Sequence, residues 1–153
     1  MTGEVEFHRN RATEGEIANH LSACDATFVP PLSGRVEIPR YAQKLLLHAT
    51  RFEAWADGSL VGLVAVYCNG PGRRFAYVTS VSVLPEERGR RIASGLMVRC
   101  TEYLRELGFE RVELEVDREN EPAIRMYHRH GFIAGDGRGG NLVMHLTLEG
   151  DHR

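Results

Sequence analysis

The sequence is poor in the features that mark several large classes of protein. Its 153 residues contain three cysteines and no Cys-x-x-Cys pair, which disfavours a disulfide framework or a structural zinc site and favours a reducing compartment. The longest apolar run, Leu60–Cys68, is far too short to cross a bilayer, and the N-terminus lacks the apolar core of a signal peptide. We therefore expect a cytoplasmic protein without a membrane partner.

The sequence also lacks a large excess of charge of either sign. The formal net charge is −2, although all but one of the 19 basic residues are arginine. A balance this close to neutral does not favour electrostatic attraction of the whole molecule to nucleic acid. The apolar share of 42% and charged share of 26% are typical of a globular protein, and the length fits one domain. We expect a single domain over residues 1–153.

Strands and helices are predicted to alternate along the chain, with no repeat or low-complexity linker. Thr13 and Glu16 have the spacing of a capping box, and Asp57-Gly58-Ser59 predicts the turn of a hairpin. Neighbouring strands in the first half and strands separated by helices in the second half predict an α/β fold with a mixed, partly antiparallel central sheet flanked by helices. Helices are expected over 40–48, 89–107 and 121–131, and a flexible turn over 135–140.

The stretch PEERGRRIASGLM, residues 85–97, places three arginines and two glycines at the start of a predicted helix. Basic side chains normally favour the other end of a helix, because the N-terminal end carries partial positive charge. Unpaired N–H groups beside glycine form a general receptor for oxyanions, and neither G-x-G-x-x-G nor G-x-x-x-x-G-K-[ST] is present. The residues alone leave two readings open, a phosphate site or a solvated arginine cluster.

Two segments carry a resemblance to a known superfamily. VSVLPEERGRRIASGLM is similar to motif A, [RQ]-x-x-G-x-[GA], of the GCN5-related N-acetyltransferase (GNAT) superfamily. NEPAIRMYHRHGF resembles its segment N-x-x-A-x-x-x-Y-x-x-x-G-F and matches it at Asn120, Ala123, Tyr127, Gly131 and Phe132. The resemblance implies a GNAT-type sheet that splays between the motif-A strand and the next strand. It also implies acetyl-coenzyme A as co-substrate.

The resemblance further implies which residues contact coenzyme A. In the family the turn binds the pyrophosphate through backbone N–H groups, and the preceding strand pairs with the pantetheine arm. Arg91 departs from the pattern, which has glycine there; we expect a helical backbone at Arg91, which any L-residue can adopt, and a guanidinium able to contact phosphate. The implied cofactor-binding residues are Ser82, Val83, Leu84, Arg88, Gly89, Arg90, Arg91, Ile92, Ala93, Asn120, Ala123 and Tyr127.

Tyr127 and Glu115 are the implied catalytic residues. A tyrosine stays protonated at neutral pH, so Tyr127 can donate a proton to the leaving thiolate. The alternative for Tyr127 is a packed core aromatic. In VELEVD, residues 112–117, carboxylates alternate with apolar residues, and LEVDREN resembles the stretch of ribosomal-protein N-terminal acetyltransferases whose Glu is the base. The alternative for Glu115 is a partly exposed strand face whose acids pair with nearby arginines.

The resulting hypothesis is an enzyme that moves an acetyl group from acetyl-coenzyme A directly to a primary amine, with no metal. We expect a small-molecule acceptor, and an acetyltransferase of protein N-termini is an alternative. A second alternative is a non-catalytic acyl-coenzyme A sensor. A third is a nucleic-acid-binding domain that uses the arginine cluster, which the acidic balance of the chain disfavours. No nucleic-acid partner is expected, and a homodimer is left open.

Overall fold

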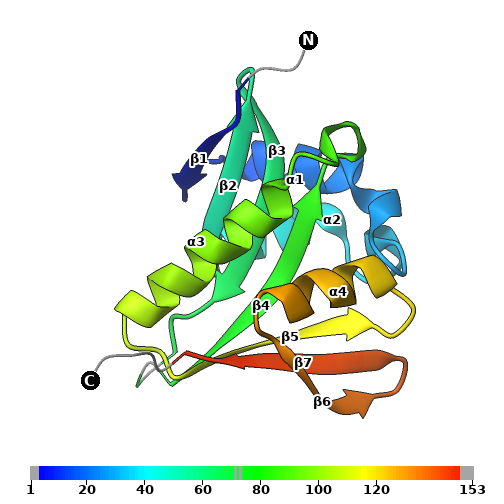
Figure 1. Cartoon of the computed structure of the whole chain (residues 1–153). Coiled ribbons are helices and arrows are strands. Elements are labelled where there is room, and N and C mark those ends of the chain that lie inside the picture. The colour runs from blue at the N-terminus through cyan, green and yellow to red at the C-terminus, as the bar shows by residue number, and fades with distance from the viewer. Residues whose placement is uncertain (1–3, 71, 73, 149–153) are drawn as a thin grey trace.

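The computed structural model describes residues 4–70, 72 and 74–148, which form an α/β structure around a seven-stranded sheet (Figure 1). The strand order is β1-β2-β3-β4-β5-β7-β6, and β4 and β5 are the one parallel pair among the described strands. The strands are β1 (Glu6–Arg9), β2 (Thr50–Ala56), β3 (Ser59–Tyr67), β4 (Phe75–Val83), β5 (Arg111–Asp117), β6 (Ile133–Arg138) and β7 (Asn141–Thr147). The helices are α1 (Glu14–Ala23), α2 (Ile38–His48), α3 (Ile92–Glu106) and α4 (Glu121–Arg129).

In the first half of the chain, two local sequence patterns form the structures that they predict. The Thr13 side chain accepts a hydrogen bond from the amide of Glu16, and the Glu16 side chain accepts one from the amide of Thr13, so the capping box at the start of α1 is confirmed. Asp57 and Gly58 join β2 to β3 with φ angles of 53° and 77°. Two central residues with positive φ are what a tight hairpin turn with the right-handed twist of its strands requires.

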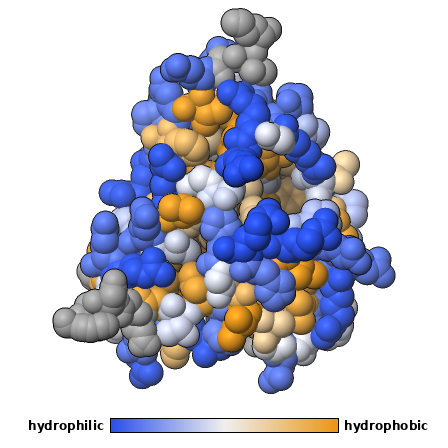
Figure 2. Space-filling view, viewed as in Figure 1, coloured by the Kyte–Doolittle hydropathy of each residue, from blue (hydrophilic) through white to orange (hydrophobic). Residues whose placement is uncertain are grey.

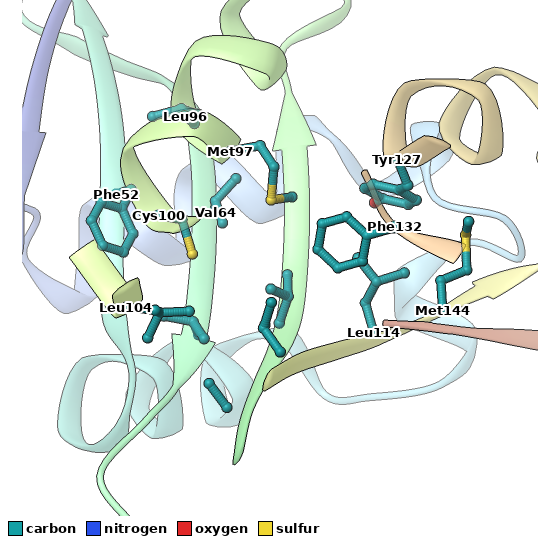
Figure 3. Close-up of a cluster of buried hydrophobic side chains, with 14 of the residues drawn as sticks. Phe52, Val64, Leu96, Met97, Cys100, Leu104, Leu114, Tyr127, Phe132 and Met144 are labelled. Atoms are coloured by element: carbon teal, nitrogen blue, oxygen red, sulfur yellow. The ribbon is translucent and has the colours of Figure 1, made fainter. Parts of the chain in front are cut away.

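Two layers of helices cover the sheet. Helices α1 and α2 pack behind β2, β3 and β4, and α3 and α4 lie on the front of the sheet in Figure 1. The front core joins α3 to the sheet through Leu96, Met97, Cys100 and Leu104, and Figure 3 shows Tyr127 and Phe132 in the same layer beyond β4. The outer surface is different: on the face in Figure 2, hydrophilic side chains cover most of the area and hydrophobic ones show in smaller patches.

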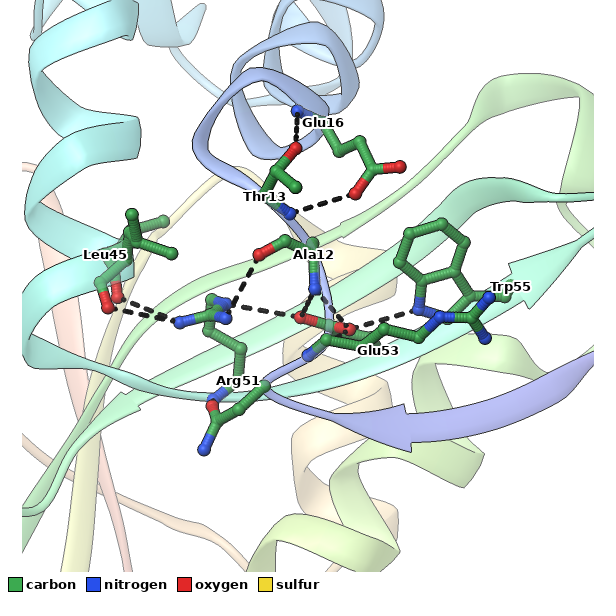
Figure 4. A network of polar contacts seen from close by, with 10 residues as sticks. Ala12, Thr13, Glu16, Leu45, Arg51, Glu53 and Trp55 are labelled. Atoms are coloured by element: carbon green, nitrogen blue, oxygen red, sulfur yellow. Dashed lines mark hydrogen bonds and ion pairs between the residues drawn. The ribbon is translucent and has the colours of Figure 1, made fainter.

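A fully buried ion pair fixes the start of the chain to β2. Glu53 is 0% exposed, and its carboxylate lies 3.2 Å from Nε of Arg51 (Figure 4). The same carboxylate accepts hydrogen bonds from the amides of Arg11 and Ala12 and from the indole N–H of Trp55. The Arg51 guanidinium also donates to main-chain carbonyls of residues 12, 45 and 46. Because each charge meets several partners, the pair is compatible with its complete burial.

The sheet splays open between β4 and β5, as the resemblance implies. The parallel register runs only from Phe75–Arg111 to Tyr77–Glu113, and beyond it the two strands diverge (Figure 1). The residues from Val78 to Val83 therefore pair with β3 alone, with Thr79 left out of the register. This part of β4 has one edge without a neighbouring strand.

Three sequence-based boundaries are corrected by the structure. Helix α2 begins at Ile38 rather than Arg40, with Pro39 in its first turn, where proline's fixed φ is tolerated. Helix α3 begins at Ile92 rather than Gly89, because the residues before it have positive φ. Residues 135–138 belong to strand β6, so only Gly139 and Gly140 of the expected flexible turn form a turn.

Candidate active site

A cleft of about 1160 Å³ lies where β4 and β5 diverge. Seven segments line it: the connection after α1, the start of α2 with the residues before it, residues 77–83 of β4, the turn into α3, the end of β5, helix α4 with the loop before it, and the first residue of β7. These segments are far apart in the sequence, and the splayed sheet brings them together. The lining includes these predicted site residues: Ser82, Val83, Arg88, Gly89, Arg91, Ile92, Ala93, Glu115, Asn120, Ala123 and Tyr127.

The unpaired edge of β4 directs main-chain groups into the cleft. The amide of Leu84 donates to the Val61 carbonyl of β3 at 2.9 Å. In an antiparallel ladder, successive residues direct their main-chain groups alternately to one side and the other. The groups of Val83 and Val81 therefore face the opening. Leu84, one of the predicted cofactor residues, uses its amide within the sheet and does not line the cleft.

A β-bulge interrupts β4 beside this edge. Val78 is registered with Val66 and Ser80 with Ala65, so Thr79 has no partner of its own on β3. The hydroxyl of Tyr41 on α2 donates to the Thr79 carbonyl at 2.9 Å and lies 2.8 Å from Thr79 Oγ1. Bulges change the direction of a strand locally, and this one is anchored from the helix behind the sheet. Tyr41, Thr79 and Ser80 all line the cleft.

The turn into α3 has a different backbone from the one expected. Arg91 is the N-cap of α3 and has φ 59° and ψ 32°, the left-handed region, so the expectation of an ordinary helical backbone at Arg91 is wrong. Glycine reaches this conformation without steric cost, whereas another L-residue pays about 1–2 kcal/mol. The structure thereby explains why the superfamily pattern has glycine at this place. Gly89, with φ 87°, supplies the other sharp change of direction.

The start of α3 presents main-chain donors to the cleft. The first hydrogen bond of the helix runs from the amide of Gly95 to the carbonyl of Arg91. The amides of residues 92–94 precede this ladder, and all three residues line the cleft. Arg88 and Arg91 also line it and add positive charge. The arrangement suits an anionic group such as a diphosphate.

Arg90 is not part of the cleft lining. Its guanidinium forms an ion pair with Glu87, with Nη1 of Arg90 2.6 Å from the carboxylate, and Glu87 is only 8% exposed. Arg90 thus pairs within the turn, with a glutamate that does line the cleft. Of the predicted cofactor residues, Arg90 and Leu84 are the two that the cleft lining does not include.

Tyr127 lies on α4 and borders the cleft from the front of the sheet. The residue is 6% exposed, and its ring centroid is 5.9 Å from that of Phe132 (Figure 3). Burial raises the pKa of the Tyr127 phenol well above its ordinary value. The phenol is therefore protonated at neutral pH and can act as a proton donor. Tyr127 is both a core aromatic and a cleft residue, so the packed-core alternative describes it and its role as an acid stays a prediction.

The start of α4 explains what Asn120 does locally. Asn120 is the N-cap of the helix, and its side-chain oxygen accepts a hydrogen bond from the amide of Ala123 at 3.4 Å. Pro122 occupies the first turn, where its missing N–H costs no hydrogen bond. Both Asn120 and Ala123 line the cleft.

Glu115 lies on β5 at the back wall of the cleft. The alternation is as predicted: Val112, Leu114 and Val116 are buried, and the acids between them are half-buried. Glu115 accepts a hydrogen bond from Nδ2 of Asn141 at 3.2 Å. Glu113 instead pairs with Arg111 at 3.1 Å. The alternative of arginine-paired acids is therefore met at Glu113.

Several cleft residues have no signal in the sequence. Val81, Thr79 and Tyr41 line the cleft because of strand register, a bulge and the packing of a helix. Residues 26–30, which follow α1, line the far side of the cleft. In the sequence they are recognisable only as part of an irregular, Pro-rich connection. Arg129, at the end of α4, adds a further positive charge to the lining.

Neither a metal cluster nor a membrane helix is found where the chain is described. Within residues 4–70, 72 and 74–148, no three His, Cys, Asp or Glu side chains gather closely enough to hold a metal ion. In the same ranges, no helix has the length and apolar character needed to cross a bilayer.

Comparison with known proteins identifies the family. Residues 17–132 match the model of the acetyltransferase (GNAT) family. The chain belongs to this family. The match spans both the turn into α3 and helix α4, which are the two segments that carry the resemblance in the sequence.

The individual relatives are named as acetyltransferases of different kinds. Streptothricin acetyltransferase of Streptomyces lavendulae is 36% identical over 97 residues, which cover 63% of this chain and 50% of that protein. N-alpha-acetyltransferase MAK3 of Arabidopsis thaliana is 35% identical over 132 residues, 86% of this chain and 67% of that protein. This chain thus spans half of the length of the first of these relatives.

A solved structure supports the fold. The PaiA N-acetyltransferase of Thermoplasma acidophilum, in complex with coenzyme A, has a TM-score of 0.75 and 17% identity. The superposition covers 94% of this chain and 99% of that one. The splayed mixed sheet is therefore a GNAT fold over nearly the whole described chain.

Proposed function

We propose that this GNAT protein is an N-acetyltransferase that moves an acetyl group from acetyl-coenzyme A to the primary amine of a small molecule. The observation that carries the proposal is the divergence of β4 and β5 beside a turn of main-chain amides, with Tyr127 at the same opening. Family membership supports acetyl transfer as the reaction. Direct attack by the amine needs both substrates in one cleft, and about 1160 Å³ is ample volume for this.

The residues of the cleft fit coenzyme A along its length. The amides of residues 92–94, with Arg88 and Arg91, would bind the diphosphate. The free edge of β4 at Val81 and Val83 would pair with the pantetheine arm as an added strand does, while the main-chain groups of Ser82 between them face β3. Asn120 and Ala123 would contact the cofactor from α4. When bound, acetyl-coenzyme A supplies an activated acyl group and a good leaving thiolate.

Tyr127 and the β4 edge would carry the two electrostatic tasks of the reaction. The amide of Val83 or Val81 would donate to the carbonyl oxygen of the acyl group while that oxygen gains negative charge. The protonated phenol of Tyr127 would give its proton to the sulfur that leaves. Burial keeps this proton on the phenol at neutral pH, so it is available where negative charge develops on the sulfur.

Glu115 would accept the proton of the attacking amine. Glu115 lines the cleft, and its carboxylate accepts a hydrogen bond from Asn141. An amine attacks only in its neutral form, so a carboxylate at this wall has a direct use. Glu113 lies two residues earlier on β5 and faces the same side of the sheet. It pairs with Arg111 and serves as a structural comparison.

The small-molecule acceptor is supported by the similarity to streptothricin acetyltransferase, whose name states a small-molecule substrate. Residues 26–30, Arg35 and Tyr41 would surround the acceptor. The similarity to N-alpha-acetyltransferase MAK3 supports the alternative of a protein N-terminus as acceptor.

A release assay separates the candidate functions. Free thiol released from acetyl-coenzyme A would be measured with a panel of small amines and with peptides that have free N-termini. Amine-dependent release supports the transferase. Binding of coenzyme A without release in any panel would favour the acyl-coenzyme A sensor, for which the strained Arg91 turn is the supporting observation. A chain that neither binds nor turns over coenzyme A would contradict both.

A further inference from the structure

His20 is a buried polar residue that the chemistry proposed above does not use. It lies on α1, is 3% exposed, and connects two strands of the sheet. Its Nδ1 is 3.1 Å from the Leu60 carbonyl oxygen of β3, and its Nε2 is 2.9 Å from the hydroxyl oxygen of Ser82 on β4. Buried polar side chains that join separate elements are costly unless every polar atom is paired, and here both ring nitrogens are paired.

The contacts determine the direction of the hydrogen bonds. A carbonyl oxygen only accepts, so Nδ1 of His20 carries the proton and donates to Leu60. Nε2 is then the acceptor, and the hydroxyl of Ser82 donates to it. Burial lowers the pKa of His20 to about 4, so the imidazole is neutral and holds this one proton at neutral pH.

Cys24 completes the group at the end of α1. Its Sγ is 3.6 Å from Nε2 of His20, and the residue is fully buried. Burial raises the pKa of the Cys24 thiol to about 11, so the sulfur is uncharged. The carbonyl of Cys24 accepts hydrogen bonds from the amide and the hydroxyl of Thr27, a residue of the connection at 26–30 that lines the far side of the cleft. The group therefore touches both the cofactor strand and the start of the acceptor wall.

Ser82 is the residue of β4 to which this group is hydrogen-bonded. It lies between Val81 and Val83, whose main-chain groups face the cleft. At this level β4 pairs with β3 only, because β5 has diverged. A side-chain hydrogen bond from another element adds a further constraint on a strand that is paired along one edge only.

We propose that His20 is a positioning residue for cofactor binding: by accepting the hydroxyl proton of Ser82 and donating to Leu60, it fixes the β4 edge to which the pantetheine arm pairs. The inference rests on the proposed function and adds to it a residue outside the GNAT motifs. His20 touches neither substrate, since it acts through Ser82.

The test is the dissociation constant of coenzyme A, measured by calorimetry. His20→Leu keeps most of the side-chain volume and removes both hydrogen bonds. We expect it to raise the dissociation constant about tenfold, because small displacements of a binding edge cost substantial affinity. His20→Gln keeps one donor and one acceptor and should recover most of the affinity.

Leu21→Ala is the matched control. Leu21 is the next residue of α1, is fully buried in the rear core, and has no polar side-chain atom that could join the hydrogen-bonded group. Its truncation leaves a cavity and destabilises the fold at least as much as His20→Leu. At temperatures well below the melting temperature of Leu21→Ala, this variant is nevertheless expected to bind coenzyme A with the affinity of the wild type.

A double-mutant cycle makes the test specific. If His20 acts through Ser82, then Ser82→Ala and the double variant His20→Leu/Ser82→Ala weaken coenzyme A binding by the same factor as His20→Leu alone. Equal affinity of His20→Leu and wild type, additive losses in the cycle, or an equal loss in Leu21→Ala would each overturn the inference while leaving the proposed function intact. A wild type that does not bind coenzyme A would overturn the proposed function, and this inference with it.

Discussion

Glu53 and Glu115 are both carboxylates on strands of the same sheet, yet their surroundings are opposite. Glu53 is fully buried and accepts from two main-chain amides, the indole of Trp55 and the guanidinium of Arg51 (Figure 4). Glu115 is half-buried, accepts from Asn141, and borders the cleft. A carboxylate enclosed by protein donors holds the fold together. A carboxylate on a cleft wall is accessible to a substrate.

The same contrast separates the two halves of the sheet. Strands β1 to β3 form an antiparallel ladder, with one register shift at Ala54/Trp55, and its buried Arg51–Glu53 charges are compensated. From β4 onward the ladder opens, main-chain amides face a cleft, and Arg91 takes a strained conformation. Strain and incomplete pairing are features of functional sites, and a rigid neighbouring region must stabilise them. Variants of the first half should therefore affect stability, and variants of the second half should affect binding and turnover.

The largest effect on stability is expected from Glu53→Ala. It leaves the Arg51 guanidinium buried without its anion and removes the acceptor of two amides and an indole. Breaking a buried pair from one side costs about 3–5 kcal/mol in the free energy of unfolding. Urea denaturation followed by circular dichroism measures it. A loss below about 1 kcal/mol would show that the Glu53 network does not hold the first half together.

The largest effect on turnover is expected from Tyr127→Phe. The ring and its contact with Phe132 are retained, so the change removes the proton donor and little else. We expect kcat to fall by about 10²-fold or more, with a small effect on the melting temperature. Since burial raises the pKa of Tyr127, the wild type should not lose its acid as pH rises through the ordinary tyrosine range. An unchanged kcat would exclude the phenol as the acid.

A smaller effect is expected from Glu115→Gln, with Glu113→Gln as the control on the same face of β5. Loss of the base should lower kcat by about 10²-fold at neutral pH. The difference in kcat from the wild type should shrink as pH rises, because an amine that is already neutral needs no base. Glu113 belongs to a partly exposed ion pair with Arg111, and its replacement should change stability by less than about 1 kcal/mol and leave kcat unchanged. Equal rates for both variants and the wild type would assign Glu115 a structural role only.

The smallest effect is expected from Arg91→Gly. Glycine relieves the left-handed strain, which should raise the free energy of unfolding by about 1 kcal/mol. It also removes a guanidinium from the diphosphate end of the cleft, which should weaken coenzyme A binding by about tenfold or less. Arg91→Ala removes the charge but keeps the strain, so it separates the two effects. Binding that is unaffected in both variants would show that Arg91 contributes strain without a phosphate contact.

Local sequence signals predicted the elements that are determined locally. The Thr13–Glu16 capping box and the Asp57-Gly58 turn depend on a few adjacent residues and form as expected. The alternation in VELEVD gave the buried and half-buried faces of β5. The pattern of two GNAT segments gave the splayed sheet and most of the cleft lining.

The remaining features depend on tertiary structure. The positive φ of Arg91 follows from how the chain turns between β4 and α3, and an arginine there gives no sign of it. Glycines at 135 and 137 suggested a turn, whereas pairing with β7 makes this segment a strand. The role of His20 depends on contacts with residues 40 and 62 positions away, which no local pattern contains.

The most direct test of the account is a crystal structure of the chain with coenzyme A. The account predicts the diphosphate within hydrogen-bond distance of the amides of residues 92–94, the pantetheine arm along Val81 and Val83, and the sulfur beside the Tyr127 hydroxyl. A cleft that stays empty at saturating coenzyme A, or a sulfur remote from Tyr127, would contradict it.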